Sequence, residues 1–122
     1  AACAKHFAVN SQELKRMSVD SQVDERTLRE IYLTGFEIAV TEGKPKAIMS
    51  SYNPVNGTYA NENPKLLLDI LRKQWGFDGF VVSDWGAVHN PPRAIKAGLD
   101  MQMPANENMT DDLKKLWKPE NM

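Results

Sequence analysis

Short apolar segments that read as strands alternate along this chain with longer segments of helical periodicity, and this alternation restricts the folds open to it. The strand-like segments are residues 1–7, 46–52, 80–83 and, more weakly, 99–103. A β-α-β-α-β-α-β-α order is typical of parallel βαβ units. Such units form open doubly wound sheets or closed barrels, and no G-x-G-x-x-G motif follows a strand to favour the dinucleotide-binding open sheet.

The helical segments between these strands have defined ends. Asp24 is predicted to cap the first helix and Gly43 to end it. The pair 63–64 (Asn-Pro) starts the second helix, residues 91–98 form a short third one, and Thr110 could cap a last one. The first helix is expected to bury one stripe, Leu28, Ile31, Tyr32, Gly35, Phe36 and Ala39. The second is expected to bury Leu66, Leu67, Ile70, Leu71 and Trp75, and the last contains Leu113, Leu116 and Trp117.

Composition removes several classes of function. The 122 residues include 15 Lys and Arg and 16 Asp and Glu, a net charge of −1 that argues against a nucleic-acid partner. No apolar run approaches the roughly 20 residues of a membrane span. Cys3 is the single cysteine, which excludes an internal disulfide and a cysteine-rich zinc site. The composition fits a bacterial cytoplasm and a periplasmic or secreted location equally well.

Polar residues stand where three of the predicted strands end. These ends are Lys5-His6, Ser50-Ser51-Tyr52-Asn53 and Ser83-Asp84-Trp85. In a (β/α)8 barrel the catalytic groups sit at the carboxyl ends of the strands. A carboxylate at such a tip, as at Asp84, suits a nucleophile or a general base, although aspartate is also common as a turn or cap residue.

The other candidates at these strand ends allow two interpretations each. The pair 5–6 (Lys-His) could bind a polyol, a phosphate or a carboxylate, or form a salt bridge at the barrel rim. Arg16 lies near Glu13 and would otherwise be an exposed surface pair. Tyr52 is either a substrate-binding group or an ordinary amphipathic rim residue.

The roles of Met49 and Trp85 are also not decided by their positions alone. Met49 is a core residue when considered alone, because methionine commonly fills gaps. Trp85 could stack on a sugar face or pack against its neighbours. The two histidines, His6 and His89, have no H-x-x-x-H spacing, so a zinc site is not expected.

Longer motifs surround these strand ends, and together they resemble a known family. They are KHFAVNSQE (5–13) followed by Arg16, MSSYN (49–53) followed by Asn56-Gly57, WGFDGFVVSDWG (75–86), and AGLDMQMP (97–104). With these motifs, residues 1–104 resemble glycoside hydrolase family 3, the family of β-glucosidases and β-xylosidases. The resemblance implies an α/β fold, namely about four consecutive βα units of a (β/α)8 barrel.

The resemblance also implies roles at single positions. Asp84 would be the catalytic nucleophile that attacks the anomeric carbon. Lys5 and His6 would bind hydroxyls of the terminal sugar, and Arg16 would add a contact in the same subsite. The remaining lining residues would be Met49, Tyr52 and, as an aromatic wall, Trp85.

The implied reaction needs a second carboxyl group. A retaining glycosidase uses two carboxyl groups about 5–5.5 Å apart, one as nucleophile and one as acid/base, and needs no metal or organic cofactor. In the family the acid/base is typically a glutamate from a later domain, and neither Glu107 nor Glu120 lies in a matching motif. The β-N-acetylglucosaminidase subgroup is disfavoured because its K-H-F-P-G-H-G loop reads KHFAVNSQ here.

These inferences lead to one main hypothesis and three alternatives. We expect residues 1–122 to be part of the barrel domain of a retaining, exo-acting β-glycosidase that removes terminal β-D-glucosyl residues from glucosides or short oligosaccharides. The alternatives are a β-xylosidase of the same family, a non-catalytic sugar-binding or assembly module, and an unrelated barrel enzyme with Lys5 as a Schiff base. Because a barrel needs about 250 residues, the remainder of the parent chain is an expected partner, and the isolated chain is expected to be inactive and marginally stable.

Overall fold

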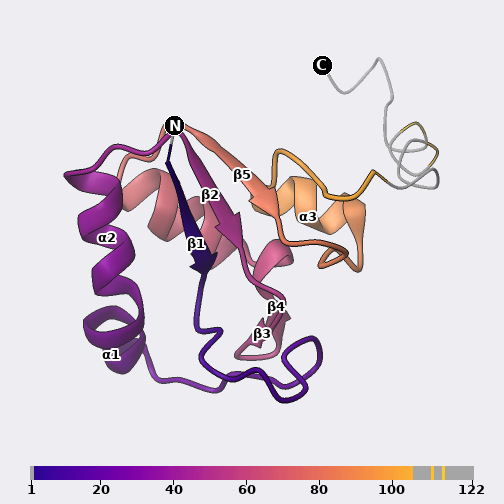
Figure 1. Cartoon of the computed structure of the whole chain (residues 1–122), viewed down its shortest axis with the longest axis horizontal. Coiled ribbons are helices and arrows are strands. Elements are labelled where there is room, and N and C mark those ends of the chain that lie inside the picture. The colour runs from indigo at the N-terminus through magenta and orange to yellow at the C-terminus, as the bar shows by residue number, and fades with distance from the viewer. Residues whose placement is uncertain (1, 106–110, 112–113, 115–122) are drawn as a thin grey trace.

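A computed structural model describes residues 2–105 together with Asp111 and Lys114. The predicted last helix and the candidates Glu107 and Glu120 therefore lie largely outside the described residues. The elements follow the order β1 (Cys3–Phe7), α1 (Glu25–Thr27), η1 (Leu28–Leu33), α2 (Thr34–Thr41), β2 (Ala47–Ser50), β3 (Pro54–Val55), β4 (Thr58–Tyr59), η2 (Ala60–Glu62), η3 (Lys65–Gln74), β5 (Phe80–Ser83) and α3 (Pro91–Ala97) (Figure 1).

The strands form a parallel sheet in the order β1-β2-β5. Its register pairs Phe7 with Ser50 and Ser50 with Ser83, so the three strands end at the same level. Helical segments separate these strands in the chain, as the alternation predicts. The predicted fourth strand is reduced to a single parallel bridge between Val82 and Met101, because the backbone of residues 99–103 pairs with β5 only around that point. The described residues thus contain three βα units and the start of a fourth.

One face of the sheet carries the core. Figure 1 shows the helices behind the sheet and on either side of it. Phe7 is fully buried and its ring lies edge-on to those of Phe36 and Trp75, with centroid distances of 5.1 and 6.0 Å. Burying one such side chain contributes about 1.5–3 kcal/mol. The predicted apolar face of η3 is confirmed, with all five residues at most 9% exposed: Leu66, Leu67, Ile70, Leu71 and Trp75.

The buried stripe of the first helix agrees with the predicted one in part, because Leu28 is buried and Tyr32 and Phe36 pack against the core. It runs without a break from Glu25 to Thr41, but Leu28–Leu33 is wound in wider π-type turns. A π turn holds more residues than an α turn, so the buried positions are Leu28 and Leu33, five residues apart, while Ile31 is 69% exposed. The prediction at α-helical spacing is therefore wrong at Ile31 and misses Leu33.

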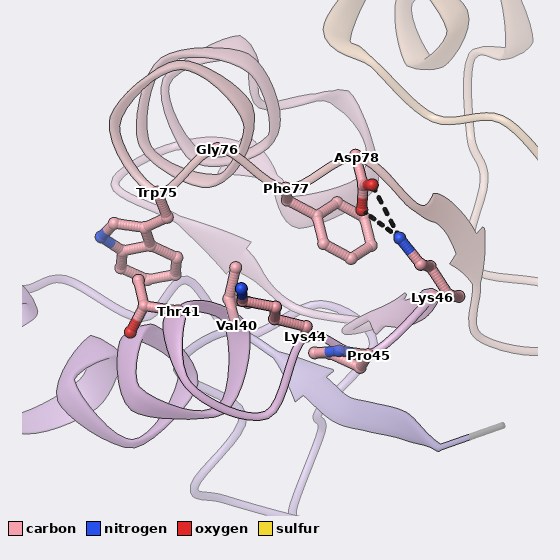
Figure 2. Close-up of a pocket in the computed structure, with 9 residues that line it drawn as sticks. All are labelled: Val40, Thr41, Lys44, Pro45, Lys46, Trp75, Gly76, Phe77 and Asp78. Carbon is pink, nitrogen blue, oxygen red and sulfur yellow. Dashed lines mark hydrogen bonds and ion pairs between the residues drawn. The ribbon is translucent and has the colours of Figure 1, made fainter.

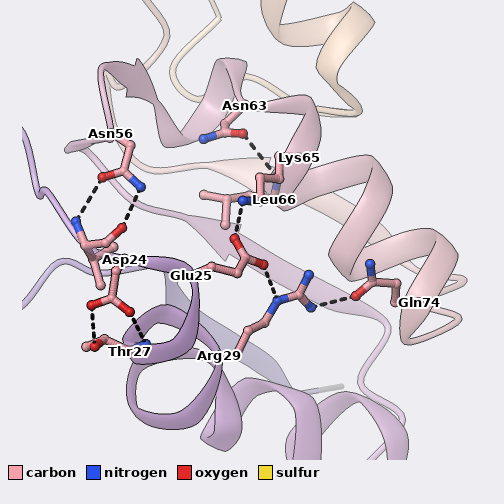
Figure 3. Close-up of polar contacts among 10 residues, drawn as sticks. Asp24, Glu25, Thr27, Arg29, Asn56, Asn63, Lys65, Leu66 and Gln74 are labelled. Carbon is pink, nitrogen blue, oxygen red and sulfur yellow. Dashed lines mark hydrogen bonds and ion pairs between the residues drawn. The ribbon is translucent and has the colours of Figure 1, made fainter.

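Side-chain caps fix the helix starts as predicted (Figure 3). The Asp24 carboxylate accepts hydrogen bonds from the Thr27 backbone N–H at 3.0 Å and from the Thr27 hydroxyl at 2.6 Å. These bonds lower the pKa of Asp24. The Asn63 side chain accepts the Leu66 N–H at 3.2 Å at the start of η3. The two helical segments are linked by Arg29, which contacts both Glu25 and Gln74.

The opposite face of the sheet is partly exposed. Phe80 and Met101 are 43% and 47% exposed, whereas Val81, which points to the helices, is fully buried. The outer edge of β1 pairs with no strand among residues 2–105. The described residues leave the sheet unclosed, and a free parallel edge beside an exposed apolar face is unfavourable for an isolated domain.

Candidate active site

The predicted site residues gather where the parallel strands end. Asp84 directly follows β5, Tyr52 lies two residues beyond β2, and His6 is the penultimate residue of β1. Because the strands end in register, these side chains from three strands reach the same edge of the sheet. The His6 Nε2 atom lies 3.4 Å from the Asp84 Oδ2 atom, and the two side chains are 32% and 15% exposed.

The Asp84 carboxylate is oriented by its own loop as well as by His6. Its Oδ1 atom accepts the backbone N–H of Trp85 at 2.7 Å, which leaves Oδ2 facing His6. The Asp84 carbonyl accepts the Ala87 N–H at 3.1 Å and closes a tight turn. Gly86 adopts φ +76° in this turn, a left-handed conformation that favours glycine. The result is a half-buried carboxylate in a defined orientation at the tip of a strand.

Tyr52 connects the β2 end to the β5 end. Its hydroxyl donates a hydrogen bond of 2.9 Å to the Trp85 carbonyl. Burial raises the pKa of Tyr52, and the nearby Asp84 carboxylate raises it further, while the Arg16 guanidinium has a weaker opposite effect. Arg16 lies over the Tyr52 ring at 4.6 Å and pairs with Glu13 at 3.1 Å, so both the site contact and the surface pair that the sequence allows are present.

The remaining three predicted site residues are less engaged. The Lys5 side chain is exposed and makes no hydrogen bond or ion pair with another described residue. Met49 is half-buried in β2 and pairs in register with Val82, two residues before Asp84. Trp85 is 63% exposed, so its indole is a free aromatic surface beside Asp84 rather than a packed core residue.

A buried polar network beneath the site was not singled out from the sequence. Asn61 accepts a short hydrogen bond from the Ser50 hydroxyl and donates to the Ser51 carbonyl at 2.9 Å and the Ala87 carbonyl at 3.4 Å. All four residues are fully buried. The run Asn61-Glu62-Asn63 looks like an ordinary polar loop before a helix, and only its density of polar residues next to an apolar helix hints at burial.

A second part of the network holds the chain that follows β1. The Ser51 hydroxyl donates to the Ala8 carbonyl at 3.0 Å, and the Ser51 N–H donates to the Phe7 carbonyl at 2.8 Å. The Asn53 amide donates to the carbonyls of Ala8 and Val9, both at 3.3 Å. These bonds satisfy carbonyl groups that the sheet leaves unpaired. They also fix the β1 end, and with it His6, against the β2 end.

The hollow at the opposite end of the sheet differs in character (Figure 2). Its charged pair is Lys46 and Asp78, joined by two hydrogen bonds of 2.7 and 2.8 Å, and the Trp75 indole and the Phe77 ring line its wall. The salt bridge lowers the pKa of Asp78. Among the described residues no group of three His, Cys, Asp or Glu side chains could hold a metal ion, and none of the described helices is long and apolar enough to cross a membrane.

The fold and the site define a parallel α/β module that collects a carboxylate, an imidazole, a phenol and an indole at the carboxyl ends of its strands. Comparison with known families gives the assignment directly. The family described as "Glycosyl hydrolase family 3 N terminal domain" matches residues 1–119. The chain therefore belongs to glycosyl hydrolase family 3, as its motifs indicate.

Individual relatives agree with this assignment. The "Thermostable beta-glucosidase B" of Acetivibrio thermocellus is 54% identical over 110 residues, 90% of this chain and 15% of that protein. An "Exo-alpha-(1->6)-L-arabinopyranosidase" of Bifidobacterium longum is 49% identical over 108 residues, 88% of this chain and 14% of that protein. The structure of beta-glucosidase 3B from Thermotoga neapolitana in complex with glucose superimposes with a TM-score of 0.89 at 48% identity, covering 93% of this chain and 17% of that one. The chain thus spans between 14% and 17% of these relatives.

Proposed function

We propose that the protein containing this chain is a retaining β-glucosidase and that Asp84 is its nucleophile. The observation that carries the proposal is the Asp84 carboxylate at the tip of β5, held by the Trp85 N–H and facing His6. Membership of glycosyl hydrolase family 3 and relatives named as β-glucosidases support the same activity.

The three βα units are, on this proposal, consecutive units of a (β/α)8 barrel. The open apolar face of the sheet, with Phe80 and Met101, would then line the barrel interior, and the free edge of β1 would pair with a further strand. Catalytic groups of such barrels lie at the carboxyl ends of the strands, where Asp84 lies. The rest of the protein would supply the missing strands and the acid/base carboxyl group.

The chemistry assigned to Asp84 is a double displacement. In the first step an Asp84 oxygen bonds to the anomeric carbon, the bond from that carbon to the leaving oxygen breaks, and the acid/base protonates that oxygen. In the second step the acid/base removes a proton from water, the water oxygen bonds to the anomeric carbon, and the bond to Asp84 breaks. The sugar leaves with retained configuration, and the Asp84 carboxylate is regenerated.

The neighbouring side chains would hold the terminal sugar during these steps. His6 and the exposed Lys5 offer hydrogen bonds to sugar hydroxyls, and Arg16 adds a cationic donor over Tyr52. Two further residues would complete the wall of the subsite, the exposed indole of Trp85 and the half-buried side chain of Met49. Contacts that strengthen towards the oxocarbenium-like transition state raise the rate more than uniform binding does.

The proposed substrate is a glycoside with a terminal β-D-glucosyl group. The Acetivibrio thermocellus and Thermotoga neapolitana enzymes are both named as β-glucosidases, and the structure of the second contains glucose. These names support glucose over other sugars. The arabinopyranosidase is nearly as similar to this chain, so the choice of sugar varies among relatives at this level of identity. Specificity would therefore depend on positions at which these relatives differ.

Substitution of Asp84 in the full-length protein tests the proposal. Asp84→Ala should lower kcat for 4-nitrophenyl β-D-glucoside at least about a thousandfold, because no covalent intermediate can form. Added azide should restore turnover of an activated aryl glucoside and yield α-glucosyl azide, since azide attacks from the vacated side of the sugar. Asp78→Ala, at the other end of β5, is the matched control and should retain full activity. Full activity of Asp84→Ala, or a β-glucosyl azide product, would refute the assignment.

A further inference from the structure

The short turn η2 (Ala60–Glu62) contacts the segment that follows the candidate nucleophile. We call residues 84–90, between β5 and α3, the nucleophile loop. Glu62 is 8% exposed, and its Oε1 atom accepts two consecutive backbone N–H groups of this loop, His89 at 3.2 Å and Asn90 at 2.6 Å. A buried carboxylate is costly unless hydrogen bonds satisfy it, so these two bonds define where the Glu62 side chain can lie.

Two more contacts attach the nucleophile loop to the chain around η2. The Asn61 amide donates to the Ala87 carbonyl at 3.4 Å. The Tyr59 and His89 rings are stacked with their centroids 3.8 Å apart and their planes 22° apart. Three residues in the second half of the loop, Ala87, His89 and Asn90, are therefore held by Glu62, its neighbour Asn61 and Tyr59. Glu62 alone holds two backbone groups.

The backbone of the nucleophile loop in turn sets the carboxylate of Asp84. The Trp85 N–H binds Asp84 Oδ1 at 2.7 Å, and the Trp85 carbonyl accepts the Tyr52 hydroxyl at 2.9 Å. A shift of the loop would move this peptide group and rotate the carboxylate away from His6. A misplacement of 1 Å can lower the rate of an enzymatic reaction about a hundredfold.

We propose that Glu62 is a positioning residue that holds the nucleophile loop, and through it the Asp84 carboxylate, in the reactive orientation. This assignment rests on the proposed function. Glu62 acts as a hydrogen-bond acceptor at a fixed distance, and its negative charge is not required. Glutamine keeps an acceptor oxygen at the same reach, whereas aspartate keeps the charge but is one methylene shorter.

Two conservative variants of the full-length protein separate distance from charge. The probe is 2-deoxy-2-fluoro-β-D-glucosyl fluoride, which traps the glycosyl-enzyme, and the measurements are the trapping rate constant and the number of sites trapped. Glu62→Asp should trap every site about tenfold to a hundredfold more slowly than the wild type. Glu62→Gln should stay within about threefold of the wild type, because its amide oxygen has two lone pairs for the same two N–H groups. Glu37→Asp, the same change at an exposed position of α2, should leave the rate constant unchanged.

The opposite pattern would overturn the inference. A slow Glu62→Gln with a fast Glu62→Asp would mean that charge, not reach, matters. Fewer trapped sites at the wild-type rate constant would mean that Glu62 only stabilises the fold. Mass spectrometry of the trapped wild type separates the two proposals. A label on a residue other than Asp84 contradicts the proposed function. If Asp84 carries the label, the trapping rate constants of the variants test the role of Glu62 alone.

Discussion

The two ends of the β1-β2-β5 sheet use ionisable residues in different ways. At the amino end Asp78 is paired with Lys46, and beside β5 Asp100 is paired with Arg72. At the carboxyl end Asp84 has no lysine or arginine within ion-pair distance among the described residues, and the imidazole of His6 lies 3.4 Å from its Oδ2 atom. The charges at the amino end are paired with each other, whereas the proposed function assigns the carboxylate at the other end to the reaction.

The buried side chains beneath the two ends of the sheet differ as well. The carboxyl end rests on fully buried polar side chains, Ser50, Ser51 and Asn61, which connect strand ends to the loops that carry the site. The amino end is closed by aromatic packing of Trp75 and Phe77. A network of this kind fixes geometry at the cost of burying polar groups, which is useful where side chains must be positioned. The comparison predicts that changes at the carboxyl end affect rate and changes at the amino end affect stability.

The largest effect among these tests is expected for His6→Ala. Removing the imidazole takes away the neighbour of Asp84 Oδ2 and a proposed contact with the sugar. We expect kcat/KM for 4-nitrophenyl β-D-glucoside to fall about a hundredfold, with little change in the thermal unfolding midpoint, because the side chain is one-third exposed. A loss below about threefold, within the range of a surface change, would contradict a role for His6 at the site.

Arg72→Ala is the counterpart at the other end of β5. The Arg72 guanidinium donates to the Gly79 and Gly98 carbonyls at 3.0 and 3.3 Å and pairs with Asp100, whose carboxylate also accepts the Val81 N–H at 2.7 Å. Its loss leaves these acceptors unsatisfied and should destabilise the protein by about 1–3 kcal/mol. The urea midpoint measures this, and kcat per folded enzyme should stay unchanged. A large fall in kcat with an unchanged urea midpoint would contradict the prediction that changes at the amino end affect stability rather than rate.

Tyr52→Phe should have a smaller effect on rate and a distinctive effect on pH dependence. Loss of one hydrogen bond to the Trp85 carbonyl is expected to lower kcat about tenfold. Because the folded protein raises the pKa of Tyr52, the tyrosine contributes stability below its ordinary value of about 10 that is lost as the pH rises through the higher folded value.

The pH dependence is followed by measuring the urea midpoints of the wild type and Tyr52→Phe at increasing pH. The difference between the urea midpoints of the wild type and Tyr52→Phe should be constant up to pH 10. At higher pH the wild type should lose stability relative to the variant. A constant gap through the alkaline range would mean that the environment of Tyr52 does not favour its protonated form.

The smallest effect is expected for Lys46→Met. Both partners of the Lys46–Asp78 pair are more than half exposed, and exposed pairs contribute little. Because the salt bridge lowers the pKa of Asp78, its contribution is present above the ordinary carboxyl value and is lost as the pH falls through the lower folded value. The midpoint difference between wild type and variant should therefore be small at pH 7 and vanish in acid. A growing difference in acid would contradict the pairing.

Much of the fold followed from local sequence patterns. The bounds of β5 and the caps at Asp24 and Asn63 were predictable, because each depends on short-range chemistry. The buried stripe of the first helix was predictable only in part, because the π-type turns of Leu28–Leu33 bury Leu33 and leave Ile31 exposed. The weak strand predicted at residues 99–103 forms one bridge with β5, between Val82 and Met101.

The site was predictable in part for the same reason. Polar residues directly after a strand, such as Asp84 and Tyr52, can be located once the strand is identified. Asn61 and Glu62 belong to no strand, and their contacts with the nucleophile loop span 26 to 28 residues of sequence. Such long-range pairing depends on the assembled fold, so the buried supports of the site became visible only in three dimensions.

The central claim is that the carboxylate at the tip of β5 forms a covalent bond with the sugar. The most direct measurement is proteolysis and tandem mass spectrometry of the full-length protein after trapping with 2-deoxy-2-fluoro-β-D-glucosyl fluoride. We predict a fluoroglucosyl ester on Asp84, in the peptide that contains the SDWG sequence of residues 83–86. A label on another carboxylate, or complete inactivation without a covalent label, would contradict the account.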